Sequence, residues 1–364
     1  MKARAEVRPE LWLALATVVS SFLVYFPFLG QMGPVYRFWD GPNYLTVARG
    51  LYEIRPDNPL LAYVYRPQFF ASYLPFYPLL VRMFAFVGYE RALLLVSVLA
   101  SLVAVQIFYR LARDVWKQSS PGFLSVVFLF VPPRWVLYRS TGASEAVYIA
   151  CTLAAVFLFE KSQVGRASAA GTLAALTRIS GFMIAPAFGV LLLLGRRWRS
   201  IPWLFLIPAG LFGYFLFCRE RFGDFFAFFS AHGEKLVRFV PFGFLPVLFE
   251  KGLYHQVEFH ILLALVYAVG TFRLRPYPVI FSYCLFELAL HLCLSTEDWS
   301  RYFLSMAPFA LVVGFRDVLD TKAFRWMLAP YAALSIYYAW GVIPLNGCRP
   351  DIYLALLDHL GLAH

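Results

Sequence analysis

The sequence predicts an all-α protein that crosses a membrane many times. Hydrophobic residues make up 61% of its 364 residues, against about 45–50% in soluble domains. Charged residues make up only 15%, where about 25% is usual. Apolar runs of roughly 20 residues, the length that a helix needs to span a bilayer, recur along the chain. A soluble domain, a disordered chain, a collagen, a coiled coil and a disulfide scaffold are therefore excluded.

The charge and cysteine patterns exclude two further classes. The net charge is +11, but basic residues in a membrane protein mostly set its topology, so nucleic-acid binding is not predicted. The five cysteines form no CxxC pair and the six histidines no HExxH motif. Neither a zinc site nor a disulfide framework is therefore expected.

The first predicted span covers residues 11–29 and sets the orientation. It follows Lys2, Arg4 and Arg8, and the positive-inside rule places that end in the cytoplasm. The segment lacks a small-residue cleavage site, so we interpret it as a signal anchor rather than a cleaved signal peptide.

The next segment, about residues 30–90, is rich in charges and prolines and is predicted to be one long external loop. Its apolar stretch Tyr73–Val87 is short and contains Pro75, Pro78 and Arg82. We interpret this stretch as an amphipathic helix at the membrane surface. If it crossed the membrane instead, the basic loops that follow would fall outside, against the positive-inside rule.

The remaining spans follow from apolar runs between basic loops. Arg166 and Arg196 are both expected in the cytoplasm, and a single full span cannot return the chain to its starting side. Two half-height helices meeting near Thr177–Gly181 can do so, and broken helices are tolerated where they line a cavity. About eleven membrane helices then form a single domain over residues 1–364. The other spans are expected at 91–109, 121–138, 143–159, 201–217, 253–272, 277–294, 302–315 and 326–343.

Five motifs that could carry chemistry fall on the predicted external side. They are Phe38-Trp39-Asp40-Gly41, Tyr73–Leu80, Tyr138–Glu145, Leu176–Gly181 and Ser295–Tyr302. Most acidic residues fall on that side as well, as expected of an enzyme that works there.

Asp40 beside Trp39 could act as a general base that is partly shielded from water. The alternative is structural: Trp39 anchors the chain at the membrane interface and Asp40 caps a helix. Glu145 opens the span after a polar turn, and there the alternative is again a helix cap with a favourable dipole contact. The paired prolines of Tyr73–Leu80 could equally form a purely structural elbow.

Two arginines could bind an anionic group, most simply a phosphate. Arg178 lies within the expected helical hairpin, where an arginine is costly and functional by default, and a half-helix N-terminus near Ser180 would assist it. The alternative is that Arg178 extends to the interface. Arg301 could bind phosphate while Asp298 positions it or binds hydroxyl groups, unless this is an ordinary solvated loop. Together the motifs suggest transfer of a group from a lipid phosphate.

These motifs, in this order, resemble the PIG-V-type mannosyltransferases (GPI mannosyltransferase 2, glycosyltransferase family 76) of the GT-C superfamily. The resemblance spans about residues 11–315. It rests on Phe38–Gly41 with Tyr44 and Ala48, Leu74–Arg82, Thr141–Glu145, Ala174–Arg178 with Gly181, Phe222-Gly223-Asp224, and Arg301-Tyr302.

The resemblance implies a GT-C fold, a catalytic acid in the first external loop, here Asp40, and a dolichyl- or polyprenyl-phosphate mannose donor. We expect Asp40 to deprotonate the acceptor hydroxyl in an inverting displacement. Substrate contacts are expected from Trp39, Tyr44, Arg66, Tyr77, Glu145, Arg178, Asp298 and Arg301. The arginines would stabilise the leaving phosphate, so no metal is required, although a divalent cation stays open.

The acceptor is expected to be a lipid-linked molecule or a glycan on the external face. The membrane would be the cell membrane in a prokaryote and the ER membrane in a eukaryote. Three alternatives stay open: a transporter or flippase of lipid-linked sugars, the same transferase class with another polyprenyl-phosphate sugar, and a non-catalytic scaffold. Transporters often carry internal repeats, and none is visible between the two halves of the sequence.

Overall fold

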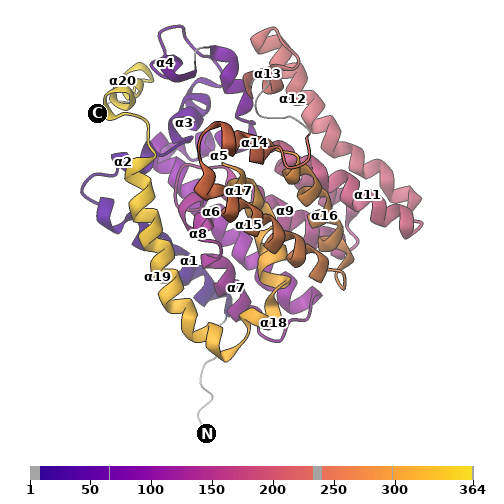
Figure 1. Ribbon diagram of the computed structural model, residues 1–364. Coiled ribbons are helices and arrows are strands. Elements are labelled where there is room, and N and C mark those ends of the chain that lie inside the picture. The colour runs from indigo at the N-terminus through magenta and orange to yellow at the C-terminus, as the bar shows by residue number, and fades with distance from the viewer. Residues whose placement is uncertain (1–8, 65, 233–239, 297, 363–364) are drawn as a thin grey trace.

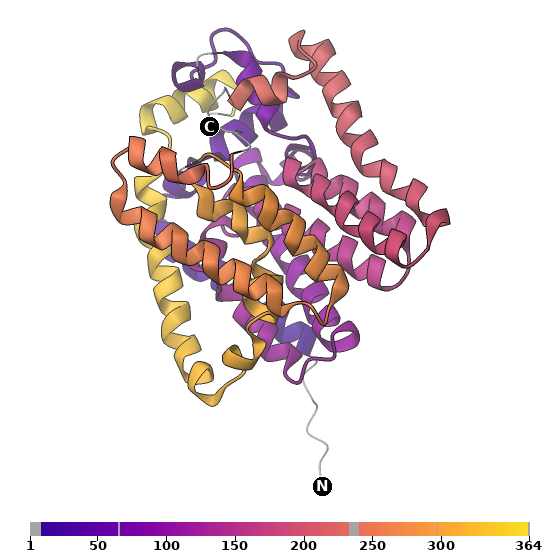
Figure 2. The same cartoon turned by 45° about the vertical axis from the view of Figure 1, so that its right-hand side comes forward.

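The computed structural model describes residues 9–64, 66–232, 240–296 and 298–362. Within these ranges the regular elements are helices, and the extended pairing is a single antiparallel bridge between Phe38 and Gly347. Figures 1 and 2 show long helices packed side by side, with many of the short helices near one end of the bundle. The all-α prediction is confirmed.

Five helical stretches in the described part are long and apolar enough to cross a membrane. The protein is therefore an integral membrane protein. The first is α1 (Pro9–Tyr25), extended by the 3₁₀ turn η1 (Phe26–Phe28), and the second is α6 (Tyr89–Arg110) with the π-helical turn η4 (Leu111–Val115). The others are η6 (Trp198–Phe205) continued by α12 (Leu206–Phe222), α15 (Tyr254–Arg273) and α19 (Lys322–Leu345).

The core forms where α6 packs against α1 on one side and against α9 (Glu145–Glu160) on the other. Side chains such as Val105 and Leu153 are fully buried there. By contrast, Leu262 on α15 and Trp326 on α19 are more than half exposed. Such outward apolar faces are what a bilayer would cover.

In the described part of residues 30–88 the helices are all short. The stretch Tyr73–Val87, predicted as one surface helix, consists of α5 (Phe76–Met83) and the 3₁₀ turn η3 (Ala85–Val87). Pro75 and Pro78 lie at the start of α5, where proline is tolerated because the first N–H groups of a helix have no partner within it. The other elements of the segment are α2 (Gly33–Tyr36), α3 (Gly41–Gly50), α4 (Leu61–Val64) and the 3₁₀ turn η2 (Pro67–Ser72).

Two predicted spans are wrong as continuous helices. The run 121–138 is divided into α7 (Pro121–Phe130) and α8 (Pro133–Tyr138), because Pro132 and Pro133 interrupt the hydrogen-bond ladder. The run 302–315 is also broken, with Pro308 near the start of its π-helical part. Its pieces are the end of α17 (Trp299–Tyr302), the 3₁₀ turn η7 (Phe303–Ser305) and the π-helical η8 (Ala307–Val313), and α18 (Arg316–Leu319) follows.

The structure contains the expected break near Thr177–Gly181. Helix α10 (Val164–Ala175) ends there, and the 3₁₀ turn η5 (Ile179–Met183) leads into α11 (Ile184–Leu194). At 1.5 Å per residue, α10 is about 18 Å long, well short of a hydrocarbon core of about 30 Å. A Cβ atom on Gly181 would lie 2.5 Å from the backbone nitrogen of Ala175. Only glycine therefore allows the turn to pack directly on the end of α10.

Different segments of the chain lie at the two ends of the helix bundle. At one end Arg113 pairs with Glu10 at 3.1 Å, Ser119 bonds Asp320 at 3.0 Å and Arg325 bonds Ser120 at 2.9 Å. These contacts gather the start of α1, the loop after α6 and the turn between α18 and α19, which the topology prediction places in the cytoplasm. Figure 1 shows α18 at one end and α4 and α20 (Pro350–His359) at the other. Which membrane face each end occupies stays a prediction.

Candidate active site

A cavity of about 900 Å³ opens between the segment after α1, the α10–α11 turn and α12. Its wall has two distinct parts. One part is polar and carries charged side chains from distant segments: Asp40, Arg178, Asp298 and Arg301, together with Tyr44, Tyr73, Ser144, Thr177 and Ser180. The other part is apolar and includes Leu211, Phe212, Phe215, Phe225, Phe226, Phe228 and Phe229 from α12, α13 (Ala227–His232) and the turn between them.

The local backbone turns Asp40 toward the cavity. Trp39 has a positive φ of 44°, and its backbone N–H donates to the carbonyl of Asn346 at 2.9 Å. A Cβ atom on Gly41 would lie 2.5 Å from the backbone oxygen of Tyr36. Asp40 precedes α3, but its side chain makes no capping hydrogen bond. The helix-cap alternative for Asp40 is therefore wrong.

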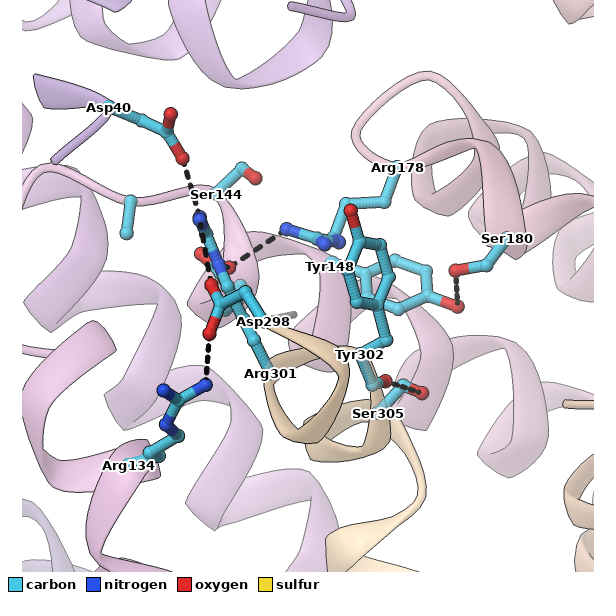
Figure 3. Close-up of polar contacts among 12 residues, drawn as sticks. Asp40, Arg134, Ser144, Tyr148, Arg178, Ser180, Asp298, Arg301, Tyr302 and Ser305 are labelled. Atoms are coloured by element: carbon cyan, nitrogen blue, oxygen red, sulfur yellow. Dashed lines mark hydrogen bonds and ion pairs between the residues drawn. The ribbon is translucent and has the colours of Figure 1, made fainter. Parts of the chain in front are cut away.

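Arg301 is the centre of the charged cluster. Its Nη2 lies 2.7 Å from Asp40 Oδ2, its Nε donates to Glu145 Oε1, and its Nη1 lies 3.9 Å from Asp298 Oδ2. Its guanidinium also lies over the ring of Tyr138, 4.5 Å from the centroid. Burial disfavours the charge, but the carboxylates of Glu145 and Asp40 outweigh it and raise the pKa of Arg301. Figure 3 shows the Asp40–Arg301 contact.

Arg178 and Arg134 complete the ring of charges. Arg178 Nη1 lies 2.8 Å from Glu145 Oε1, and its guanidinium lies over the ring of Tyr302 at 5.2 Å. Arg134 on α8 pairs with Asp298 Oδ1. Within the described residues, Arg178 Nε and Nη2 have no hydrogen-bond partner and Glu145 Oε2 has none either. Arg178 therefore has donors left for a ligand, whereas Arg301 is occupied by carboxylates.

The six groups balance one another. Asp40, Glu145 and Asp298 provide three negative charges, and Arg134, Arg178 and Arg301 provide three positive charges. Glu145 and Arg301 are almost fully buried. Such a network is stable only while each charge keeps its partner. It follows that Arg301 organises the acids and does not offer an open cationic site.

Tyr73 holds the second oxygen of Asp40. Its hydroxyl donates to Asp40 Oδ1 at 3.0 Å and accepts a hydrogen bond from Asn43 Nδ2 at 2.8 Å. Burial, with the Asp40 carboxylate as the next cause, raises the pKa of Tyr73 well above its ordinary value. The phenol therefore keeps its proton and remains a donor to Asp40.

Not every residue predicted for substrate contact lies in the cavity wall. Six of them line it: Trp39, Asp40, Tyr44, Arg178, Asp298 and Arg301. Glu145 lies directly behind Arg178 and Arg301. Tyr77 is fully buried, bonds the carbonyl of Leu93 at 3.0 Å and packs on the ring of Tyr44 at 4.7 Å, so it supports Tyr44 and does not face a sugar. Arg66 bonds the carbonyl of Ser230 and lies outside the charged cluster.

Sequence reasoning missed two members of the site. Arg134 lies in the run 121–138, and an arginine inside a predicted span is a functional signal in its own right. Tyr73 opens one of the five motifs, but nothing in the sequence places its hydroxyl on Asp40. Among the described residues, no group of three or more His, Cys, Asp and Glu side chains is arranged to hold a metal ion.

The likeness to known proteins lies in the fold. No family model matches the sequence, and no curated protein matches it. The crystal structure of ArnT from Cupriavidus metallidurans bound to undecaprenyl phosphate is similar with a TM-score of 0.56 at 14% identity, over 97% of this chain and 78% of ArnT. The apo structure of ArnT gives the same score over 77% of its length.

A second similar structure is the archaeal oligosaccharyltransferase AglB from Archaeoglobus fulgidus, in complex with an inhibitory peptide and a dolichol-phosphate. Its TM-score is 0.50 at 12% identity, over 93% of this chain and 56% of AglB. The chain therefore has the GT-C fold. At these identities the likeness extends to the fold alone, and membership of the PIG-V-type group stays a prediction.

Proposed function

We propose that the protein is a membrane glycosyltransferase that takes a sugar from a polyprenyl-phosphate donor. One observation carries the proposal: a single cavity has an arginine with free donors at its polar part and a continuous set of phenylalanines at its apolar part. A lipid phosphate has two matching parts, an anionic head and a long apolar tail. The similar proteins ArnT and AglB were solved with undecaprenyl phosphate and dolichol-phosphate, which supports this donor class.

In the proposed reaction Asp40 acts as the general base. It lies in the cavity wall, so an acceptor hydroxyl can reach it, and the hydrogen bonds from Tyr73 and Arg301 fix its orientation. Positioned general bases contribute about 10²–10⁴-fold to a rate. The acceptor oxygen attacks the anomeric carbon as the bond to the phosphate breaks, and a single displacement inverts that centre.

Arg178 is proposed to bind the phosphate. Its guanidinium has Nε and Nη2 free, and guanidinium groups bind phosphate oxygens through two parallel hydrogen bonds. Arg301 takes a different role from the one expected for it, because its donors already hold Asp40 and Glu145. It positions the base. We retain mannose as the first donor sugar to test, with a lipid-linked or glycan acceptor.

The first test is a transfer assay with purified protein, radiolabelled polyprenyl-phosphate mannose and membrane lipid extract. Wild type is expected to transfer the label, and Asp40→Asn is expected to lose transfer. Asp57→Asn is the matched control, because Asp57 lies in the same segment and its side chain is 73% exposed. Transfer should also persist in a chelating buffer, since the proposal has Arg178 bind the phosphate without a metal ion.

The outcomes separate the alternatives. Transfer only from polyprenyl-phosphate glucose or arabinose would keep the enzyme class and correct the sugar. Loss of transfer in chelating buffer, restored by a divalent cation, would overturn the metal-free mechanism. Movement of a labelled lipid-linked sugar across the bilayer of a vesicle without transfer would favour a flippase.

A further inference from the structure

A second polar cluster lies behind the cavity, among residues that the proposed mechanism does not use. Its centre is Glu287 on α16 (Pro278–Leu292), which is fully buried. Tyr148 of α9 donates to Glu287 Oε1 at 2.8 Å. On the other oxygen, Ser305 donates at 3.4 Å and His291 Nε2 lies 3.0 Å away. A carboxyl inside a membrane protein is expensive to bury, and its presence indicates a function.

The cluster reaches the cavity through one side chain. Ser180 of η5 lines the cavity, two residues after Arg178. Its hydroxyl donates to Tyr148 at 3.0 Å, so two hydroxyl groups connect the cavity with Glu287. Figure 3 shows Ser180 and Tyr148 beside Arg178. These two hydrogen bonds point toward Glu287. Hydroxyl groups both donate and accept hydrogen bonds, so when Glu287 carries the proton, rotation of both hydroxyls turns the chain toward the cavity.

The reaction creates a need for a proton at this place. A phosphodiester donor has one negative charge, and the released phosphate monoester gains a second charge when the bond to the sugar breaks. Arg178 already shares its charge with Glu145, and the charged cluster as described has no positive charge in excess. A second negative charge beside a cluster without excess positive charge is costly. A proton delivered to the phosphate would remove that cost.

We infer that Glu287, Tyr148 and Ser180 form a proton relay that supplies the leaving phosphate. This inference rests on the proposed function and adds a general acid to it. The geometry that carries it is the unbroken chain from a buried carboxyl to the hydroxyl of Ser180, which lines the same cavity as Arg178.

The protons balance over one turnover. Glu287 begins the cycle protonated, because a fully buried carboxyl avoids the cost of a charge in this form. As the bond to the sugar breaks, Ser180 gives its proton to a phosphate oxygen. Tyr148 then gives its proton to Ser180, and Glu287 gives its proton to Tyr148. Ser305 then hydrogen-bonds the carboxylate. Asp40 meanwhile holds the acceptor proton. Once the product has left, water in the cavity passes this proton back through Ser180 and Tyr148 to Glu287.

The test compares two tyrosine variants that lose the same hydroxyl group. Tyr148→Phe breaks the chain. Tyr283→Phe is the control. Tyr283 is equally buried, and its hydroxyl lies 3.3 Å from that of Tyr148 and interacts with Glu287, but it does not connect Glu287 with Ser180. Single-turnover transfer would be measured in mixtures of H₂O and D₂O. General acids contribute about 10²–10⁴-fold, and a phosphate needs less help than most leaving groups, so we expect Tyr148→Phe to be about tenfold slower.

The isotope data separate a relay from a merely structural role. Several protons move in wild type, so a plot of its rate against the deuterium fraction of the solvent should be curved. Tyr283→Phe should give the same curved plot. Tyr148→Phe should give a straight line, because only the proton taken by Asp40 then moves. Ser180→Ala should behave like Tyr148→Phe, and it decides the question if Tyr148→Phe does not fold.

Three results would overturn the relay. The relay would be ruled out if active wild type gave a straight plot of rate against deuterium fraction, or if Tyr148→Phe gave the curved plot of wild type. Either result would leave the proposed function intact. Absence of transfer by wild type from every polyprenyl-phosphate sugar would remove both.

Discussion

Arg301 Nη2 lies 2.7 Å from Asp40 Oδ2, although the two residues are 261 positions apart in the chain. The same guanidinium binds Glu145 through Nε. The contact therefore joins three segments: the turn before α3, the start of α9, and α17. Because the base of the proposed reaction is oriented by this guanidinium, the geometry of Arg301 becomes the first property to test.

Arg301→Lys is expected to slow transfer strongly while the protein stays folded. Lysine keeps the charge but cannot form the fork that holds Asp40 and Glu145 at once. Small misplacements of catalytic groups cost about 10²-fold, so a loss of that size is predicted in kcat. Arg325→Lys is the control, since it alters an exposed ion pair with Asp320 at the opposite end of the bundle. Equal activity of both variants would contradict the role given to Arg301.

Tyr73→Phe should lower kcat by about tenfold with little change in KM, because the hydroxyl contacts Asp40 and orients the base. The raised pKa of Tyr73 keeps its proton in place. As the pH rises to about 10, the ordinary pKa of tyrosine, wild type and Tyr73→Phe should therefore lose rate in the same way. Tyr337→Phe, exposed on α19, is the control. An alkaline limb that disappears in Tyr73→Phe would show that Tyr73 itself titrates.

Phe215→Ala should weaken binding of long-chain donors more than of short-chain ones. Phe215 lies in the apolar part of the cavity and contacts the rings of Phe225 and Phe229 at 5.6 Å. Burial of an aromatic side chain contributes about 1.5–3 kcal/mol, so the KM of a long-chain donor should rise by about tenfold or more. Phe259→Ala removes an exposed ring on α15 and should change neither KM. The same increase for a short-chain donor would mean that this region does not hold the tail.

Gly41→Ala should impair both activity and thermal stability. Its Cβ atom would lie 2.5 Å from the backbone oxygen of Tyr36, so the turn that carries Asp40 would have to shift. Gly50→Ala, at the other end of α3, has no atom within 4 Å of the new Cβ and serves as the control. Thermal melts and the transfer assay check this, and an unchanged Gly41→Ala variant would mean that the turn tolerates displacement.

The sequence contained enough information for the long helices and for one break. Continuous apolar runs predicted α1, α6, α12, α15 and α19, because length and hydrophobicity are local properties. The break between α10 and α11 followed from the basic residues on both sides of it. The breaks in 121–138 and 302–315 were not predicted, because apolar composition alone does not distinguish a continuous helix from one interrupted at Pro132, Pro133 or Pro308.

The site was predictable only as a set of candidates. Motif chemistry selected Asp40, Glu145, Arg178, Asp298 and Arg301, and the structure brings these together. The sequence could not show that Arg301 binds carboxylates, because its partners Glu145 and Asp40 lie 156 and 261 positions away in the chain. Tyr77 and Arg66 were expected to contact substrate on residue type alone. Their contacts to Leu93 and Ser230 come from packing that no local pattern encodes.

The transfer assay with wild type and Asp40→Asn tests the central claim most directly. The account predicts that wild type moves labelled sugar from a polyprenyl-phosphate donor to a membrane acceptor, that Asp57→Asn does the same, and that Asp40→Asn does not. Transfer by Asp40→Asn at the wild-type rate would contradict Asp40 as the base. Absence of transfer by wild type with every polyprenyl-phosphate sugar would contradict the function itself.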